Sequence, residues 1–376
     1  MKTLKRILLF GIVAGVTFFT ACEDDETETL NKEESQEVIE TNSKQMETAF
    51  SEMKESKGMK AIEVLGGLLQ EDDPFSNQKN LDVSKDFITN ISEILNPEKL
   101  YTEKAGNTQF IFGDYTGTYT WQPNNPWDID SNNPDDAIII EFPADTANYS
   151  EEGNNAVLTV SNYEEQKITT DTGDIWMPVT LSAKLKISGT EYVNVDYSLT
   201  LDSDGNPAKV SMLLDLKPYS YKLEFESNNM MFSLFKDGEN RAILSTDLQF
   251  TFLTSEMNKV KEINGSFQMG NTNFDGWVKP HALTDSSQYE NVQSMGDFAD
   301  QMNENMSIKV YKFDSGEKMA NLVFEDFDTT PAYPIMGDIA LVFEYNDGTT
   351  QEAGPYFESI ITQIESMFNQ LQEEEL

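Results

Sequence analysis

Hydrophobic and polar residues alternate through the middle of the chain, and this pattern predicts a series of β-strands. Val179–Ile187 and Val193–Leu201 both place an apolar side chain at every second position, with polar residues between them. Successive side chains of a strand point to opposite faces, so each run has one apolar and one polar face. Short turns such as 188–190 and 204–205 separate the runs. Residues 176–253 therefore predict a continuous antiparallel meander.

Further strands are predicted on both sides of this meander from the same two-residue period. On the N-terminal side they are 111–121, 137–142 and 156–163, and the proline-rich stretch 122–136 is interpreted as a loop. On the C-terminal side they are one or two strands in 265–278, a hairpin of 307–313 with 318–324, and a hairpin that starts with 339–345.

Helices are predicted near both ends of the chain. Ile39, Met46, Phe50 and Met53 recur at spacings of three, four and seven, which marks one face of a helix. Two shorter helices are expected over 59–69 and 84–95, a polar one near 285–306, and a final one over 355–372. Pro355 suits the first turn of this last helix, because its missing N–H is not needed there.

Together these elements predict an α+β fold. An antiparallel sheet can leave one face to solvent, but its apolar face must be covered. The prediction is therefore a large curved antiparallel β-meander with amphipathic N- and C-terminal helices packed on one face. Residues 36–97 form the helical segment and 98–376 the β-rich domain, and 36–376 are expected to be one folded unit.

The N-terminal stretch has the pattern of an export signal rather than of a folded element. Lys2, Lys5 and Arg6 precede a short apolar run, 7–19, which ends in Phe19-Thr20-Ala21-Cys22. The run is shorter than the roughly 20 residues of a membrane span and suits a secretory signal over 1–21. Cys22 is the one cysteine of the chain, so no disulfide can form within it. Residues 22–35 are acidic and polar and are expected to form a flexible tether.

The end of this run resembles a bacterial lipobox, with Phe19 where leucine is usual. In such proteins the cysteine, here Cys22, becomes the first mature residue and carries diacylglycerol. The acidic residues that follow, Glu23, Asp24, Asp25 and Glu26, resemble the sorting signal of surface lipoproteins of the Bacteroidota (flavobacterial type). The resemblance covers about the first 30 residues. It implies a lipid anchor in the outer membrane with the body facing the cell surface, and the periplasmic face is the alternative.

The net charge and the absence of catalytic motifs limit the functions that the sequence allows. The chain has 66 acidic and 26 basic residues, a net charge of −40, which repels nucleic acid. His281 is the one histidine, and no nucleophile elbow, Walker A loop or dinucleotide fingerprint is present. Asp202, Asp204 and Asn206 match the start of a calcium loop, but Leu213 stands where the bidentate glutamate belongs. A hairpin turn explains these residues better, and no cofactor is expected, with calcium as the alternative.

An aromatic group is the other candidate site. Tyr115, Tyr119 and Trp121, with Trp127 nearby, could form a platform for sugar or lipid, or they could pack in the core. The sequence thus favours a non-enzymatic envelope lipoprotein with a binding role. One alternative is a carrier of lipid or another hydrophobic ligand in a helix-lidded half-barrel. A second alternative is a carbohydrate-binding or carbohydrate-active surface protein.

Overall fold

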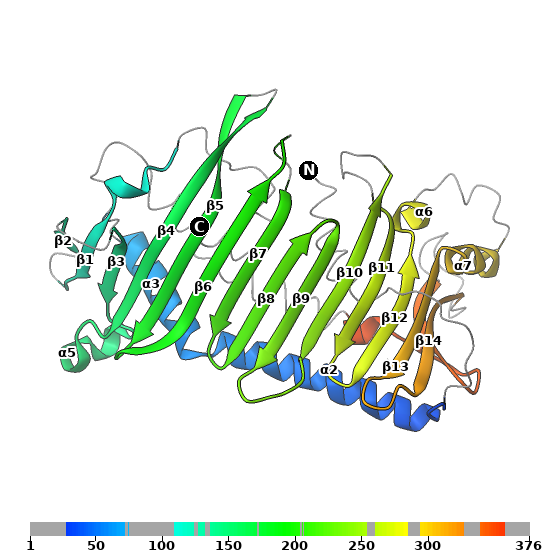
Figure 1. Cartoon of the computed structure of the whole chain (residues 1–376). Coiled ribbons are helices and arrows are strands. Elements are labelled where there is room, and N and C mark those ends of the chain that lie inside the picture. The colour runs from blue at the N-terminus through cyan, green and yellow to red at the C-terminus, as the bar shows by residue number, and fades with distance from the viewer. Residues whose placement is uncertain are drawn as a thin grey trace. The chain divides into compact units, whose positions relative to one another are not determined.

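The computed structural model describes residues 28–71, 74, 109–123, 127–131, 136–170, 173–203, 205, 207–253, 260–284, 294–326 and 339–357 (Figure 1). They cluster into two compact units. Unit 1 holds the described residues of 28–49, 228–234 and 239–357, and unit 2 holds those of 50–227 and 235–238.

Sixteen strands of the described residues form one hydrogen-bonded sheet, in which β3 to β16 follow each other in chain order and β1 and β2 complete the β3 end. The strands of unit 2 are β1 (Gly117–Trp121), β2 (Trp127–Asp130), β3 (Ile138–Phe142), β4 (Ala156–Thr170), β5 (Gly173–Ile187), β6 (Thr190–Leu201), β7 (Pro207–Leu216) and β8 (Tyr219–Glu226). The strands of unit 1 are β9 (Asn229–Lys236, of which 229–234 belong here), β10 (Leu244–Phe252), β11 (Val260–Met269), β12 (Thr272–Val278), β13 (Met306–Lys312), β14 (Lys318–Asp326), β15 (Ile339–Tyr345) and β16 (Thr350–Glu352).

The predicted antiparallel sheet is confirmed, with three differences at its β1 end. The strand predicted over 111–121 is confined to β1, because a short 3-10 helix, Phe112–Asp114, occupies its first part. The meander over 176–253 and both C-terminal hairpins form as expected, and 265–278 supplies two strands. The stretch 122–136, which was interpreted as a loop, contains β2, which pairs with β1 so that Trp121 lies opposite Trp127. Because β2 occupies one edge of β1, β3 joins the other edge and runs parallel to β1.

Two helices open the described chain, as the sequence predicts. They are α2 (Lys32–Lys54) and α3 (Lys57–Glu71). The Asn31 side chain caps α2 by accepting from the Glu34 N–H at 2.9 Å, and Ser56 caps α3 by accepting from the Met59 N–H at 3.2 Å. The apolar face predicted for α2 is confirmed, since Ile39, Met46, Phe50 and Met53 are all buried.

In unit 1, residues 32–49 of α2 run along the lower ends of the strands in the view of Figure 1, on the apolar side of the sheet, which we call the inner face. The Asn42 amide donates to the Thr272 hydroxyl of β12 at 2.8 Å, and the Ser35 hydroxyl reaches the Met319 carbonyl of β14 at 3.5 Å. Both polar side chains are buried, so hydrogen bonds as well as apolar contacts hold the helix on this face.

The segment before α2 is packed against the sheet. Thr29 forms a parallel bridge with Lys318, Leu30 donates its N–H to the Lys318 carbonyl at 3.0 Å, and the Leu30 side chain is buried. The helix then starts at Lys32. Residues 28–35 therefore do not belong to the flexible tether predicted for 22–35. The remaining part of that stretch, 22–27, lies outside the described residues, as does the predicted signal 1–21.

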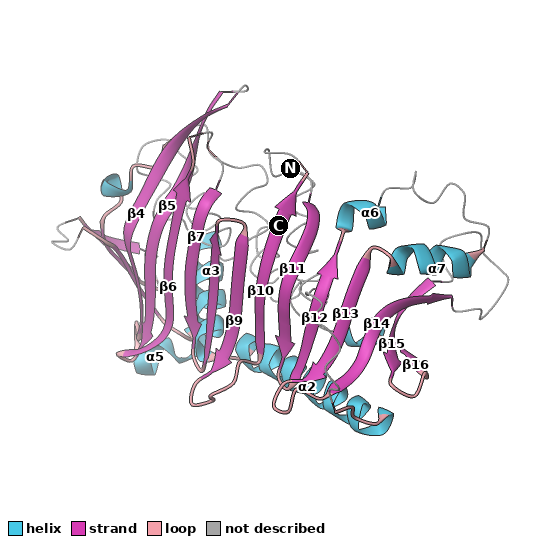
Figure 2. Ribbon diagram, turned by 45° about the vertical axis from the view of Figure 1, so that its right-hand side comes forward, coloured by secondary structure: helices cyan, strands magenta, loops and turns pink. Residues whose placement is uncertain are grey.

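The shorter helices are η1 (Phe112–Asp114), η2 (Thr146–Asn148), α5 (Tyr149–Glu152), α6 (Pro280–Thr284) and α7 (Met295–Asn303). Figure 2 shows α7 beside β13 and β14. The Asn303 side chain of α7 donates to the Phe324 carbonyl at 2.9 Å and accepts from the Phe324 N–H at 2.7 Å, so it pairs with β14 as a strand residue would.

The helix predicted near 285–306 is shorter in the structure, because Met306 already begins β13, and 285–293 lie outside the described residues. Of the final helix predicted over 355–372, residues through Phe357 are described and are helical. The helix predicted over 84–95 also lies outside the described residues.

Two glycines face each other on β11 and β12 in unit 1. Gly265 is the register partner of Gly276, and the next strand places Ile308 opposite Gly276. A methyl group on Gly276 would overlap the Ser307 carbonyl oxygen, and one on Gly265 would overlap the Asp247 carbonyl oxygen. These positions therefore require glycine, because the neighbouring backbones approach too closely for any side chain.

Candidate functional site

Several residues singled out by the sequence lie outside the described part of the chain. These are the lipidation candidate Cys22, the acidic residues Glu23, Asp24, Asp25 and Glu26, and Asp204 and Asn206 of the calcium candidate. Asp202 is described, and its carbonyl accepts from the Gly205 N–H at 3.2 Å. This bond closes a turn between β6 and β7, in which Gly205 has a φ of +80°.

The aromatic candidates do come together in unit 2. Tyr115, Tyr119 and Trp127 are buried, and the Tyr119 hydroxyl donates to the Tyr115 carbonyl at 2.8 Å. Trp121 is half-buried and meets the Tyr149 ring edge to face at 5.1 Å. Trp121 is thus the member of the group with the most exposed ring, and a sugar or lipid platform at these residues stays a prediction.

Next to this group a carboxylate sits among aromatic rings. Glu165 of β4 accepts from the Tyr163 hydroxyl at 2.7 Å and from the Phe110 N–H at 2.9 Å. Phe110 stacks on Tyr115 at 4.9 Å and meets Tyr163 edge to face at 5.3 Å. Burial raises the pKa of the Glu165 carboxyl, while the two hydrogen bonds oppose the shift. The carboxylate ties the segment before β1 to β4.

We expect the Glu165→Gln variant to be at least as stable as the wild type at pH 7. A carboxyl whose folded-state pKa is raised stabilises the fold when protonated, and this contribution is lost as the pH rises through that pKa. The gain should be below about 1 kcal/mol, because water screens a half-buried carboxylate. Urea unfolding of both proteins between pH 4 and 8 measures it. A variant that is less stable at pH 7 but equal at pH 4 would contradict this sign.

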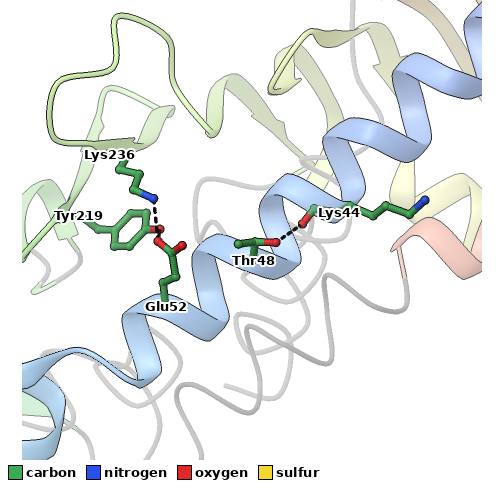
Figure 3. A network of polar contacts seen from close by, with 5 residues as sticks. All are labelled: Lys44, Thr48, Glu52, Tyr219 and Lys236. Carbon is green, nitrogen blue, oxygen red and sulfur yellow. Dashed lines mark hydrogen bonds and ion pairs between the residues drawn. The ribbon is translucent and has the colours of Figure 1, made fainter.

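A polar network joins α2 to β8 and β9 within unit 2 (Figure 3). Glu52 Oε2 accepts from the Tyr219 hydroxyl at 2.5 Å and from Lys236 Nζ at 2.7 Å. The Lys236 bond, followed by the Tyr219 bond, lowers the pKa of the Glu52 carboxyl, and burial raises the pKa of Tyr219 to about 12. Tyr219 therefore stays a hydrogen-bond donor at neutral pH, which suits a structural contact between helix and sheet rather than a general base.

The outer face of unit 2, opposite its apolar inner face, is internally hydrogen-bonded. Asp196 accepts from Ser182 at 2.9 Å and from Asn194 at 3.1 Å, and Asp215 accepts from Ser220 at 2.6 Å. Further ion pairs on the same strands are Lys209 with Glu226 and Lys222 with Glu224. The carboxylates Asp196 and Asp215 of this face thus each have a donor from a neighbouring side chain.

The outer face of unit 1 carries a continuous line of polar residues, one from each of six neighbouring strands. We call it the polar row, and each member is the register partner of the next: Asp247, Ser266, Asp275, Lys309, Asn321 and Glu344. The Glu344 end is bonded, because the Asn321 amide donates to Glu344 at 3.0 Å. At the other end Asp247 accepts from the Asn229 amide at 3.2 Å when that amide is oriented to satisfy both of its groups.

The centre of the polar row is different. For the side chains of Ser266, Asp275 and Lys309, the described structure contains neither a hydrogen bond nor an ion pair within 4 Å, although Asp275 and Lys309 are direct cross-strand neighbours. Burial raises the pKa of the Asp275 carboxyl, and the Lys309 charge opposes that shift. A half-buried carboxylate without a donor is uncommon in proteins.

Trp277 flanks this centre. It lies two residues from Asp275 on the same face of β12, between Asn264 of β11 and Ser307 of β13 in the register. The Lys279 ammonium lies 4.6 Å from the centre of the Trp277 ring, and this cation–π contact holds the indole in place. The indole remains partly exposed. Polar groups and an aromatic ring are therefore combined on one open surface.

This surface was not among the residues that the sequence singled out. Asp247 and Lys309 are 62 residues apart in the chain, and each is an ordinary polar position of an alternating strand. The signal that could have found them is the register, which depends on turns that the pattern alone does not align.

No protein-family model matches the chain, and no curated protein or solved structure is significantly similar to it. None of the helices in the described ranges has the length and hydropathy needed to cross a membrane. In the same ranges, no three His, Cys, Asp or Glu side chains are grouped so that they could hold a metal ion.

Proposed function

We propose that the protein is a lipid-anchored envelope protein with a non-enzymatic binding role, and that it binds its ligand on the outer face of unit 1. The observation that carries the binding role is the polar row, whose central groups have no partners within the described protein. The anchor rests on the resemblance of residues 19–26 to lipoprotein signals. The acyl chains of such an anchor bind a membrane stably, at about 0.8 kcal/mol per buried methylene.

The packed N-terminal segment adds a geometric consequence to the anchor. Five residues lie between Cys22 and Glu28, which are six residue steps apart, and the Glu28 carbonyl already accepts from the Lys318 N–H at 3.1 Å. A chain spans at most roughly 3.5 Å per residue, so Glu28 would stay within about 20 Å of the lipidated cysteine. Unit 1 would accordingly be held close to the membrane surface.

Core packing in unit 1 favours a binding protein over a carrier. Leu248, Phe274 and Val310 point to the inner face and are 0% exposed. A hollow sheet with a helical lid would leave such side chains exposed to the cavity. The inner face at these strands is therefore filled by the protein itself.

Unit 2 supplies the observation that favours the alternative of a hydrophobic carrier. On its inner face Leu214, Leu223 and Phe225 of β7 and β8 are half-buried, although neighbours such as Met212 are 1% exposed. A bound lipid would cover this patch. Native mass spectrometry of gently extracted protein should then show a co-purified lipid, and a Leu223→Ser variant should lose it.

The anchor is tested by replacing Cys22 with serine. We expect the variant to incorporate no radiolabelled palmitate and to leave the outer-membrane fraction, because serine cannot form the thioether. As the matched control, an Asp24→Asn and Asp25→Asn double variant should keep the label and lose its accessibility to external protease. Palmitate labelling of the serine variant at the wild-type level would reject the anchor.

A further inference from the structure

We infer that the centre of the polar row, together with Trp277, is a binding site for a neutral polyhydroxylated ligand, that is, a glycan. The inference deepens the proposed function, because it names the ligand class for the same surface. It rests on three properties of the described residues: their spacing, their missing partners and their charge.

The spacing of these polar side chains follows from the register of the strands. Ser266, Asp275 and Lys309 are direct neighbours on β11, β12 and β13, so they repeat at the strand separation of about 4.8 Å. The hydroxyls on alternate carbons of a sugar ring are spaced over a similar distance, and each can both donate and accept. A carboxylate supplies acceptors and an ammonium supplies donors, so alternate hydroxyls of one ring, or hydroxyls of neighbouring rings, can find partners along the row.

The missing partners distinguish this surface from the outer face of unit 2. There, Asp196 and Asp215 accept from neighbouring side chains, whereas Asp275 has a neighbouring serine and a neighbouring lysine in the register and bonds to neither. The Asp275 carboxylate is half-buried, so water compensates it incompletely. A ligand hydroxyl that donates to it would supply the bond that the protein leaves open.

Charge selects a neutral ligand. The chain as a whole carries −40, which disfavours polyanions, and Lys309 at the centre of the row disfavours basic peptides and cations. Asp247 and Asp275 lie two strands apart with Ser266 between them, roughly 10 Å, which is too far to bind one cation together. A neutral glycan is repelled neither by the net negative charge nor by Lys309.

The indole of Trp277 completes the site. Sugar rings have apolar C–H faces, and a partly exposed aromatic ring can contact such a face. The polar groups beside it can then bind the hydroxyls around the edge of the sugar ring. Lys279 restrains the indole from one side, which reduces the entropy that binding would otherwise cost.

The test uses the purified full-length chain in affinity electrophoresis through gels that contain, one at a time, a β-glucan, an α-glucan, a mannan, a xylan, the polyanion alginate or no polysaccharide. We expect at least one neutral polysaccharide to retard the wild type. Asp275→Asn and Trp277→Ala should each weaken that binding at least tenfold. Asp196→Asn on the outer face of unit 2 is the matched control and should bind like the wild type.

Folding is controlled separately. Because the Asp275 carboxylate has no hydrogen bond to lose among the described residues, the Asp275→Asn variant should melt at the wild-type temperature or above it. Weaker binding by this variant therefore reports on the site. The inference is overturned if no neutral polysaccharide retards the wild type, if only alginate does so, or if the two variants bind like the wild type. None of these outcomes depends on Cys22, so palmitate labelling tests the lipid anchor independently of glycan binding.

Discussion

The Gly276→Ala variant is expected to be among the least stable single variants of this protein, with a loss of roughly 3 kcal/mol in the free energy of unfolding. The added methyl group would overlap the Ser307 carbonyl oxygen and would lie 2.8 Å from the Ile308 Cα. Both atoms are backbone, so no side-chain rotation can relieve the overlap. Either β12 and β13 separate locally or the whole unit shifts.

Urea unfolding followed by tryptophan fluorescence measures this loss, and limited proteolysis shows whether unit 1 opens first. Gly296→Ala is the matched control in the same unit. Gly296 lies in α7 and has an ordinary φ. A methyl group added there would have the Ser294 Oγ, at 3.8 Å, as its nearest neighbour, so alanine at this position should stabilise the protein by up to about 1 kcal/mol. Equal effects of the two substitutions would show that the strands at Gly276 are not as close as described.

A second large loss is expected for Phe274→Ala, about 3–5 kcal/mol. Phe274 of β12 is 0% exposed, and its ring centre lies 5.5 Å from that of Phe267 and 5.7 Å from that of Phe357. Removal of the ring leaves a cavity between the sheet and the residues after β16, which the fixed backbone cannot fill.

The graded variant Phe274→Leu separates cavity formation from a general loss of packing. It keeps most of the apolar volume and should cost less than half as much in the same unfolding measurement. If alanine at position 274 costs less than about 1 kcal/mol, the Phe267, Phe274 and Phe357 cluster does not hold unit 1 together.

The sequence predicts the sheet well because the two-residue period extends through most strands. Long alternating runs such as Val193–Leu201 leave little doubt about which face is buried, and the turn glycines set their ends. β2 was missed because it is four residues long and lies between prolines, where its period is too short to detect. The true start of α2 was missed because its buried face includes Ser35 and Asn42, which look like exposed residues.

The candidate site could not be predicted to the same extent. Aromatic residues such as Tyr119 stand out in a sequence, yet the structure uses this one in the core of unit 2. The polar row consists of residues that any solvent-facing strand contains. The Asp196 carboxylate has a side-chain hydrogen bond, whereas the Asp275 carboxylate has none among the described residues. This difference depends on the three-dimensional neighbours of each side chain, which the sequence does not show.

The bond between Ser35 and Met319 joins residues 284 positions apart. The chain is synthesised from its amino terminus, so the segment beginning at Glu28 is made early and must wait for its strand partner until most of the chain has followed. Maturation of unit 1 should therefore be a late event and slow, as non-local topologies are.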